Sequence, residues 1–293
     1  MTGIGFVLGT GRCGSTLAHE VLCRHTGVDF FSNLEDLSPI FRRLNQWNGA
    51  LLRALPPTAS QKGRLRFAPS EGYRALDRAS LQMLTDPYRD LQANDLTPWM
   101  RQRLYEVILG NREREPDKVF LHKFTGWPRA MLLNQVFPEA KFVHVVRDGR
   151  AVANSWLQMP WWQGHRGATG WQFGSVPTSM HEEWVAAGES LPALAGIAWK
   201  LLMKAHDDAK FQFGNIRWLD VRYEDMVAQP ETVIGQILDF FDMPGTDSFA
   251  RQIARYEFSA GKVDAFRRDL GDEHTAMLTR LLEPELAAWH YLD

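Results

Sequence analysis

Short apolar runs alternate with helical patterns along much of this chain. Residues 4–9 (IGFVLG) are an apolar run of strand length, and residues 15–25 then place apolar side chains at helical spacing. Residues 118–124 (KVFLHKF) and 140–147 (AKFVHVVR) are further runs of this kind, and the second is the strongest strand pattern in the sequence. Helical spacing follows it at 149–158. This alternation is typical of a chain that returns repeatedly to one sheet.

The remaining signals extend the same alternation. They are two strand candidates, 28–31 and 216–226, and three helix candidates, 128–138, 194–211 and 230–244. Because connections between parallel strands are right-handed, we predict an α/β fold in three layers, with a central, mostly parallel sheet flanked by helices. Ligands bind at the carboxyl ends of the strands in such sheets. This rule places three segments side by side, namely the 9–16 loop, the strand end at Arg147 and the strand end at Tyr223.

Two segments interrupt the alternation. Residues 34–115 have mostly helical but irregular patterns, and a loop rich in Trp and Gly is expected at about 159–192. We therefore expect one domain over 1–293, with a helical insertion at the first segment and a long loop at the second. The tryptophans of the loop could stack on a sugar or line an apolar acceptor pocket, or they could simply pack a core. The loop could also be a mobile lid.

Composition and charge describe the setting of the protein. The 293 residues are 45% hydrophobic and 23% charged, as in ordinary soluble globular proteins. The net charge of −2 offers no general attraction for nucleic acid or an anionic membrane. The two cysteines, Cys13 and Cys23, give neither a disulfide framework nor a metal-ligand spacing, and no stretch is apolar for long enough to span a membrane. We therefore expect a cytoplasmic protein that has no membrane span, binds no nucleic acid and holds no metal.

The segment GTGRCGST (9–16) follows the first strand candidate and has the form of a phosphate-binding loop. The version that binds ATP and GTP is G-x-x-x-x-G-K-[ST]. Here Ser15 occupies the lysine position, and the cation is Arg12. Glycines let the backbone approach an anion closely, and the N–H groups that begin the next helix bind it. The missing lysine disfavours a triphosphate with magnesium and favours one phosphate or sulfate group. A glycine-rich turn that binds nothing is the alternative.

Three segments together resemble the sulfotransferases that use 3′-phosphoadenosine 5′-phosphosulfate (PAPS) as donor, of the cytosolic and carbohydrate types. The segments are GTGRCGSTLAHEVL (9–22), FPEAKFVHVVRDGRAVANSW (137–156) and VRYEDMVAQPETVIGQILDFFDMP (221–244). Residues 34–115 and 159–192 have no counterpart in this resemblance. It implies a P-loop NTPase-like fold, PAPS as co-substrate, 3′-phosphoadenosine 5′-phosphate (PAP) as product, and no metal.

The resemblance also assigns the residues that bind the donor. In the family, the loop cradles the 5′-phosphosulfate, and an Arg at a strand end and a Ser eight residues later hold the 3′-phosphate. A Tyr lies near the adenine, and a late basic segment closes over the nucleotide. The corresponding residues here are Gly11, Arg12, Cys13, Gly14, Ser15, Thr16 and Leu17 in the loop, Arg147 and Ser155, Tyr223, and Lys262 and Arg267. Without the resemblance, Arg147 and Asp148 could be a simple ion pair, and the late basic residues could be the solvated start of a helix.

Sulfuryl transfer needs a cation for the leaving phosphate and a base for the acceptor hydroxyl. The resemblance implies that Arg12 neutralises the departing phosphate and that Lys123 reaches the sulfuryl group. In several relatives a glutamate after the first helix and second strand is the base, which here ranks Glu35 first and Asp36 second. His122 ranks third, because neighbours on a strand point to opposite faces and His122 cannot face the site together with Lys123.

We therefore predict an enzyme that moves a sulfuryl group from PAPS to a hydroxyl acceptor by in-line transfer with a carboxylate base. The acceptor would be a small molecule, a lipid or a carbohydrate, and the chain could form a homodimer. Two alternatives stay open. One is a P-loop kinase-like phosphotransferase that binds ATP with magnesium, and the other is a relative that binds PAP or another nucleotide without catalysing transfer.

Overall fold

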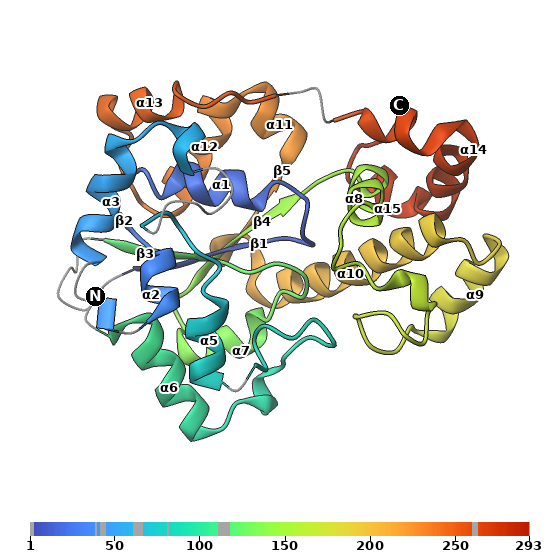
Figure 1. Ribbon diagram of the computed structural model, residues 1–293, viewed down its shortest axis with the longest axis horizontal. Coiled ribbons are helices and arrows are strands. Elements are labelled where there is room, and N and C mark those ends of the chain that lie inside the picture. Colours follow the sequence, from blue (N-terminus) through green and yellow to red (C-terminus); the bar gives the residue numbers. More distant parts are fainter. Residues whose placement is uncertain are drawn as a thin grey trace.

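In the part of the chain that the computed structural model describes, five parallel strands form the central sheet (Figure 1). The structure describes residues 3–38, 40–41, 45–60, 67–80, 82–110, 118–259 and 263–292. The strands are β1 (Gly3–Leu8), β2 (Val28–Asp29), β3 (Val119–Lys123), β4 (Lys141–Val146) and β5 (Trp218–Arg222). Their order across the sheet is β2-β3-β1-β4-β5. The prediction of a parallel sheet flanked by helices is confirmed, and β1, which leads into the 9–16 loop, lies at its centre.

Alternate residues of the strands face two separate cores. Val7, Leu121 and Val143 pack on one face against a group of helices, which are α1 (Ser15–Leu22), α11 (Tyr223–Ala228), α12 (Pro230–Phe240) and α13 (Asp247–Ile253). Phe6 and Phe120 pack on the other face against α5 (Tyr73–Ser80), α6 (Pro98–Ile108) and α7 (Ala130–Val136). Since both faces are covered, the strands are apolar throughout, as buried parallel strands are.

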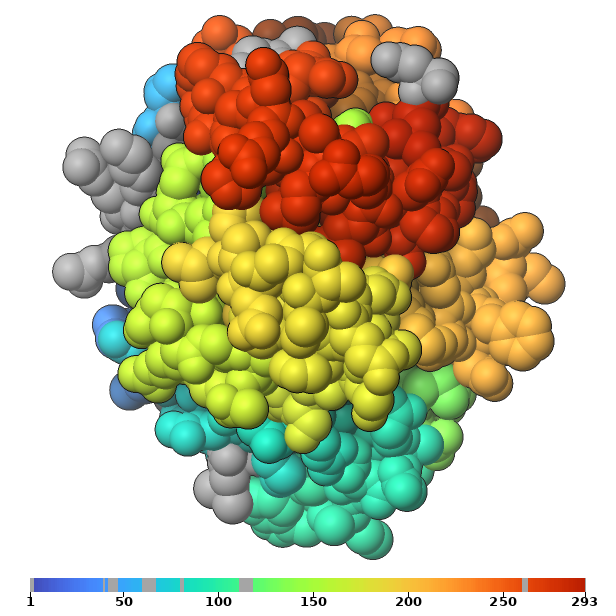
Figure 2. All heavy atoms as spheres, turned by 90° about the vertical axis from the view of Figure 1, so that its right-hand side faces the viewer, coloured from blue at the N-terminus to red at the C-terminus, as the bar shows by residue number. Residues whose placement is uncertain are grey.

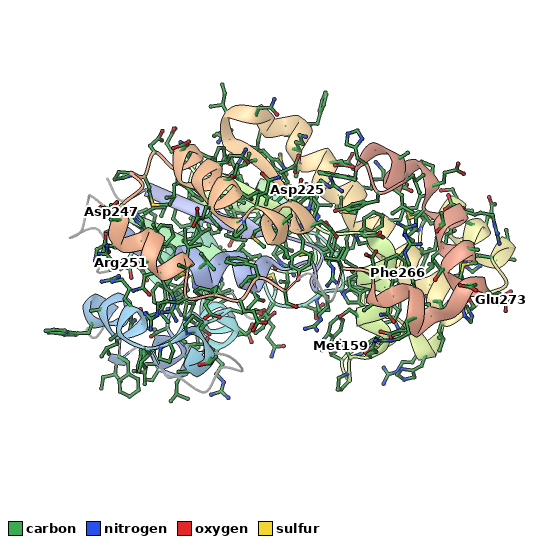
Figure 3. The ribbon with its side chains drawn as sticks, turned by 90° about the horizontal axis from the view of Figure 1, so that it is seen from above. Met159, Asp225, Asp247, Arg251, Phe266 and Glu273 are labelled. Carbon is green, nitrogen blue, oxygen red and sulfur yellow. The ribbon has the colours of Figure 1, made fainter. Side chains whose placement is uncertain are left out.

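A third core lies beyond the edge of the sheet where the loop after β1 turns back (Figure 1). Its helices are α8 (Gly149–Leu157), α9 (Thr178–Ala186), α10 (Leu191–Arg217), α14 (Ala265–Leu281) and α15 (Glu283–Ala288). The red C-terminal helices lie directly over the yellow segment of α9 and α10 in Figure 2. Phe266 lies on the inner side of α14 and is buried, whereas Glu273 lies at its exposed outer edge (Figure 3).

The two interrupting segments contain short elements of their own. The first holds α2 (Asn33–Leu37), α3 (Asn45–Ala54), α4 (Pro57–Ser60), α5, the 3-10 turn η3 (Ala93–Asp95) and α6. The second holds the 3-10 turn η5 (Gly164–Arg166) and α9. Trp162 and Trp171 of the second segment are buried in the third core, while Trp161 is exposed. Packing therefore accounts for most of the tryptophans in this region.

Several element boundaries differ from the sequence prediction. The second strand has only two paired residues, Val28 and Asp29. The last strand ends at Arg222, and Tyr223 begins α11, whose first turn carries two acidic residues that favour a helix N-terminus. Helix α10 begins earlier than expected because the Ser190 side chain accepts a hydrogen bond from the backbone of Ala193. Within the described ranges, no helix has the length and apolar character needed to cross a membrane.

Candidate active site

The loop between β1 and α1 turns through three residues with positive φ. These residues are Gly11 at 86°, Arg12 at 58° and Gly14 at 95°. A Cβ at Gly14 would lie 2.2 Å from the ring of Tyr223, so only glycine fits between the loop and α11. Gly14 also precedes α1 directly and offers no side chain to cap it. The N–H groups of the first turn of α1 therefore remain for an anion.

Arg12, Ser155 and Arg147 come together at this loop. Arg12 Nε donates a hydrogen bond to Ser155 Oγ over 2.9 Å, and Arg147 Nη1 donates to the carbonyl oxygen of Arg12 over 3.1 Å. The guanidinium carbon of Arg147 lies 4.8 Å from the centre of the Tyr223 ring. The loop, the end of β4 and the start of α11 are thus neighbours, as the rule for parallel sheets predicts.

Asp148 caps α8 and pairs with Arg150 instead of Arg147. Its carboxylate accepts a hydrogen bond from the backbone of Arg150 over 2.8 Å and lies 2.7 Å from Arg150 Nη2. Both side chains are almost fully buried. Asp148 is therefore committed to capping α8 and to the Arg150 pair, while Arg147 is directed at the loop.

Lys123 and Glu71 form an ion pair beside the loop. Lys123 Nζ lies 2.6 Å from Glu71 Oε1 and 2.8 Å from Thr16 Oγ1, in the first turn of α1. The Lys123 side chain is 2% exposed, whereas that of Glu71 is 34% exposed. The Tyr73 hydroxyl donates to the other oxygen of Glu71 and lies 3.4 Å from Thr125 Oγ1. A solvent-accessible carboxylate and a buried ammonium therefore sit together where the loop ends.

The pKa of Glu71 is lowered from its ordinary value. Burial by itself would raise this pKa, but the charge of Lys123 and the hydrogen bonds from Lys123 and Tyr73 outweigh it. The same surroundings raise the pKa of Tyr73, first through burial and then through the charge of Glu71. Glu71 is consequently a carboxylate, and Tyr73 a neutral donor, at neutral pH.

Sequence reasoning missed Glu71. It comes from the irregular segment at 34–115, and its position depends on an antiparallel bridge between Ser32 and Pro69 and on a hydrogen bond from Ser70 N to Phe31 O. The only local signal is that Glu71 precedes Gly72, which has a φ of 65°. This signal marks a turn and says nothing of Lys123.

Glu35 and Asp36 hold helices together in this structure. The Glu35 carboxylate accepts hydrogen bonds from Ser32 N over 3.1 Å and Asn48 Nδ2 over 3.3 Å, and it completes the capping box of α2. Asp36 Oδ1 accepts from Ala75 N over 3.0 Å, at the start of α5. The structure thus gives the two carboxylates ranked first as bases local roles in fixing α2, α3 and α5.

His122 lies on the opposite face of the sheet from Lys123. It is fully buried, and its ring centre lies 5.3 Å from that of Phe31 and 4.8 Å from that of Phe124. The expectation that His122 and Lys123 face different sides is confirmed. His122 belongs to the aromatic packing beneath α5 and α6.

The remaining predicted residues divide into two groups. Cys13 and Ser15 are buried at the base of the loop, and Leu17 packs against the core beneath α1. Arg267 is exposed, lies 3.6 Å from Asp264 and covers the ring of Phe266, so its described contacts are within its own helix. Lys262 lies outside the described residues.

Comparison with known proteins identifies the family of this chain. The sequence matches the family described as the sulfotransferase family over residues 6–247. The chain belongs to the sulfotransferase family. It is therefore an enzyme of sulfuryl transfer, as the sequence predicts, and the kinase-like alternative is set aside.

Individual relatives are distant in sequence, and they match between about half and nearly all of the chain. Omega-hydroxy-beta-dihydromenaquinone-9 sulfotransferase Stf3 of Mycobacterium bovis is 23% identical over 305 residues, which cover 92% of this chain and 72% of that protein. Protein-tyrosine sulfotransferase A of Caenorhabditis elegans is 26% identical over 144 residues, 49% of this chain and 32% of that protein. The crystal structure of sulfotransferase STF9 from Mycobacterium avium superimposes with a TM-score of 0.59 at 16% identity, covering 98% of this chain and 76% of that one. This likeness confirms the P-loop NTPase-like fold of the sulfotransferase.

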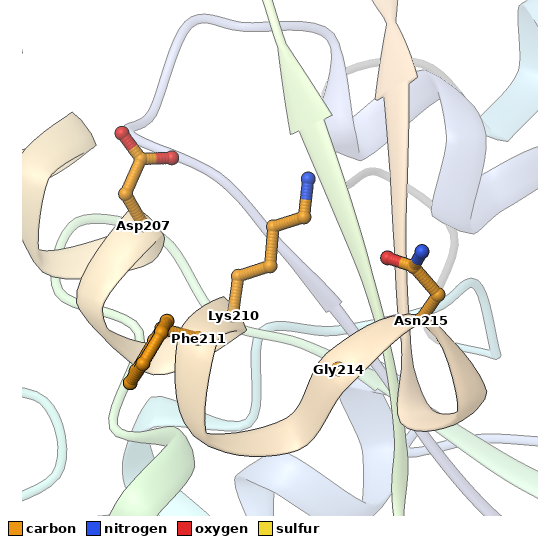
Figure 4. A pocket seen from close by; sticks show the side chains of 5 residues that line it. All are labelled: Asp207, Lys210, Phe211, Gly214 and Asn215. Atoms are coloured by element: carbon orange, nitrogen blue, oxygen red, sulfur yellow. The ribbon is translucent and has the colours of Figure 1, made fainter.

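A pocket on the surface of this sulfotransferase lies away from these groups. Its lining comes from the C-terminal end of α10, namely Asp207, Lys210, Phe211, Gly214 and Asn215 (Figure 4). Lys210 Nζ reaches β5, where it lies 2.6 Å from Asp220 Oδ2. None of the residues assigned above to the loop, Lys123 or Glu71 lines the pocket. Among the described residues, no group of three or more His, Cys, Asp and Glu side chains has the arrangement of a metal site.

Proposed function

We propose that this sulfotransferase moves the sulfuryl group of PAPS to a hydroxyl acceptor and releases PAP. The observation that carries the proposal is the contact of Lys123 with both Glu71 and Thr16, which supports a carboxylate base and a cation acting together at the end of a phosphate-binding loop. A loop of this kind, without the lysine of nucleoside triphosphatases, suits a single phosphosulfate group.

The donor would lie along the edge where the strands end. The loop and the first turn of α1 would bind the 5′-phosphosulfate through backbone N–H groups. Arg147 would bind the 3′-phosphate with Ser155, because its guanidinium offers a planar fork of donors that matches a phosphate. Tyr223, stacked on Arg147, would lie beside the adenine. These assignments follow the family resemblance, and the contacts among the three side chains support them.

Glu71 is the base that the geometry favours. In the proposed step the acceptor oxygen attacks sulfur, its proton passes to the carboxylate of Glu71, and the bond from sulfur to the bridging phosphate oxygen breaks. Arg12 would stabilise the charge that develops on the departing phosphate, and Lys123 would hold a sulfuryl oxygen. Glu35 and Asp36 remain as alternatives with less support, since their carboxylates already serve α2, α3 and α5.

The acceptor is proposed to be a small or lipid-like molecule with a hydroxyl group. By their names, one relative acts on a menaquinone derivative and another on protein tyrosine. Tyr73 and Trp161, both exposed, would flank an apolar or flat acceptor near Glu71. The cysteines Cys13 and Cys23 are free and buried, which fits the reducing cytoplasm as the compartment.

Calorimetric titration with PAP and with ATP and magnesium tests the donor. Micromolar binding of PAP without magnesium, weakened about 10- to 100-fold in Arg147→Ala, is the expected result. Tight binding of ATP with magnesium, without binding of PAP, would overturn the proposal. A screen of hydroxyl acceptors with labelled PAPS then separates an active sulfotransferase from a relative that only binds the nucleotide.

A further inference from the structure

A buried indole N–H faces the phosphate-binding loop. Trp156 follows Ser155 on α8 and is 0% exposed. Its Nε1 has no hydrogen-bond partner in the described part of the chain. A Cβ built on Gly11 would lie 3.8 Å from this nitrogen and 4.0 Å from the Cβ of Thr125. The N–H therefore lies close to Gly11, on the side of the loop that also faces Thr125.

Aromatic neighbours fix the orientation of this indole. Trp162 stacks on it with ring centres 5.6 Å apart and an interplanar angle of 27°, and the ring of Phe173 lies at the same distance. Trp161 meets it edge-on at 6.3 Å. These three rings fill the surroundings of the indole without offering an oxygen acceptor. Leaving a buried N–H unpaired is unfavourable, so an acceptor that arrives with a ligand would be favoured.

Other buried tryptophans of the chain do not share this position. Trp127, Trp184 and Trp218 donate their N–H groups to oxygen atoms of the protein. Trp199 and Trp162 also lack a partner among the described residues. However, Trp199 turns carbon atoms of its ring toward Gly149, and the nitrogen of Trp162 lies against Gly164. Among the described tryptophans without a partner, Trp156 is the one that contacts the loop.

We propose that Trp156 binds the donor, through a hydrogen bond from Nε1–H to an oxygen of the sulfuryl group. The inference rests on the proposed function. The sulfuryl group is favoured over the 5′-phosphate because Gly11 adjoins Thr125, whose hydroxyl lies 3.4 Å from that of Tyr73, the residue bonded to Glu71. Gly11 thus links the indole, through Thr125 and Tyr73, to the end of the loop where the proposed base lies. The phosphate instead meets the N–H groups that begin α1.

A neutral, rigid donor in this place orients the sulfuryl group for in-line attack. The rings around the indole prevent it from turning, so the direction of its N–H is set before the donor binds. It adds no charge that would compete with Arg12 or Lys123 for the departing phosphate. Trp156 would therefore orient the reacting group by direct contact. The contact should strengthen the binding of PAPS and leave that of PAP unchanged, because PAP lacks the sulfuryl group.

The test compares the binding of PAPS with that of PAP in Trp156→Phe and in Trp162→Phe as its matched control. Both variants remove a buried indole from the same cluster, but only the first removes the N–H at the loop. We expect Trp156→Phe to weaken PAPS about 10-fold, the usual effect of one hydrogen bond to a charged group, and to leave the dissociation constant of PAP within about 2-fold. Trp162→Phe should change the dissociation constants of PAPS and PAP by the same factor. The ratio of the two constants is independent of the fraction of folded protein.

A second measurement needs no variant. In protein labelled with ¹⁵N at the indoles, the Trp156 signal can be assigned through its nuclear Overhauser contact with Gly11, and we expect it to shift on addition of PAPS and far less with PAP. An equal loss of affinity for PAPS and PAP in Trp156→Phe, or an indole signal that does not shift with PAPS, would overturn this inference and leave the proposed function intact. Wild-type protein that binds neither ligand would instead overturn the proposed function.

Discussion

The ammonium of Lys123 lies 2.6 Å from the carboxylate of Glu71 and reaches the phosphate-binding loop at Thr16 with the same nitrogen. One buried cation therefore joins the loop that would hold the donor to the group that would take a proton from the acceptor. It keeps that carboxylate ionised, and it draws an anionic sulfuryl group toward it. The pair explains why a glutamate from the irregular 34–115 segment can serve a site built on the sheet.

Replacing Glu71 with Gln should separate catalysis from binding of the nucleotide. The amide keeps the shape of the side chain but cannot accept a proton, so kcat should fall by about 10²-fold or more. The dissociation constant of PAP, measured by calorimetry, should stay within about 2-fold, since Glu71 is not proposed to touch the nucleotide.

Glu35→Gln is the control for this experiment. Glu35 completes the capping box of α2, so its replacement should lower the free energy of unfolding by about 0.5–2 kcal/mol and leave kcat of the folded enzyme nearly unchanged. Normal turnover in Glu71→Gln together with a large loss in Glu35→Gln would return the base to Glu35.

The pH dependence of kcat/KM should follow the lowered pKa of Glu71. A base must be ionised, and Glu71 holds its negative charge to a lower pH than an ordinary glutamate, whose pKa is about 4.3. Activity should therefore persist as the pH falls and decline only below that value. His19, whose pKa burial and Lys123 lower to about 4, begins to gain charge in the same range.

Lys123→Met should move the acid limb of the pH profile, where kcat/KM declines as the pH falls, to higher pH. Burial raises the pKa of Glu71 once the ammonium is gone, so the carboxylate becomes protonated earlier as the pH falls. The variant will be slower at every pH, but the pH at which kcat/KM declines can still be measured. His19→Gln is the control, and it should leave the acid limb at the same pH. If His19→Gln shifts the limb and Lys123→Met does not, the limb reports the titration of His19.

Parts of the site that lie at the carboxyl ends of strands could be predicted from the sequence. The loop follows β1, Lys123 ends β3 and Arg147 follows β4, and parallel strands bring these ends to one edge. The capping role of Glu35 also has a sequence signature, because Ser32 and Glu35 are spaced as a capping box.

The position of Glu71 could not be predicted in this way. It is fixed by contacts between residues far apart in the sequence, the bridge of Ser32 with Pro69 and the ion pair with Lys123. Neither leaves a periodic pattern. The unpaired N–H of Trp156 is similarly invisible, since helical spacing places Trp156 in the core without saying which edge of its ring meets Gly11.

Arg147→Ala should weaken PAP by about 10- to 100-fold, because it removes the donor fork proposed for the 3′-phosphate. Adenosine 5′-phosphosulfate, which lacks that phosphate, should bind both proteins with similar affinity. Arg267→Ala is the matched comparison, since Arg267 is exposed and lies beside Asp264. Calorimetry with both ligands decides whether Arg267 also contributes; an equal loss of the two ligands in Arg147→Ala would contradict its assignment to the 3′-phosphate.

Removing Asp148 should destabilise the fold far more than removing an exposed carboxylate. Arg150 is almost fully buried, and besides Asp148 it donates to the carbonyl oxygen of Tyr291 and to Thr279 Oγ1. Asp148→Ala leaves this charge without its counter-ion and should lower the free energy of unfolding by about 3–5 kcal/mol. Asp208→Ala, which breaks the exposed pair with Lys204, should cost less than about 1 kcal/mol.

Urea unfolding of the two variants measures this difference, and the double variant Asp148→Ala with Arg150→Met sharpens it. If the cost of Asp148→Ala comes from an uncompensated buried charge, removing the charge as well should recover much of the loss. If it comes from the lost cap of α8, the double variant should be no more stable than Asp148→Ala alone. Equal stabilities of Asp148→Ala and Asp208→Ala would show that the buried pair does not hold α8 against the C-terminal segment.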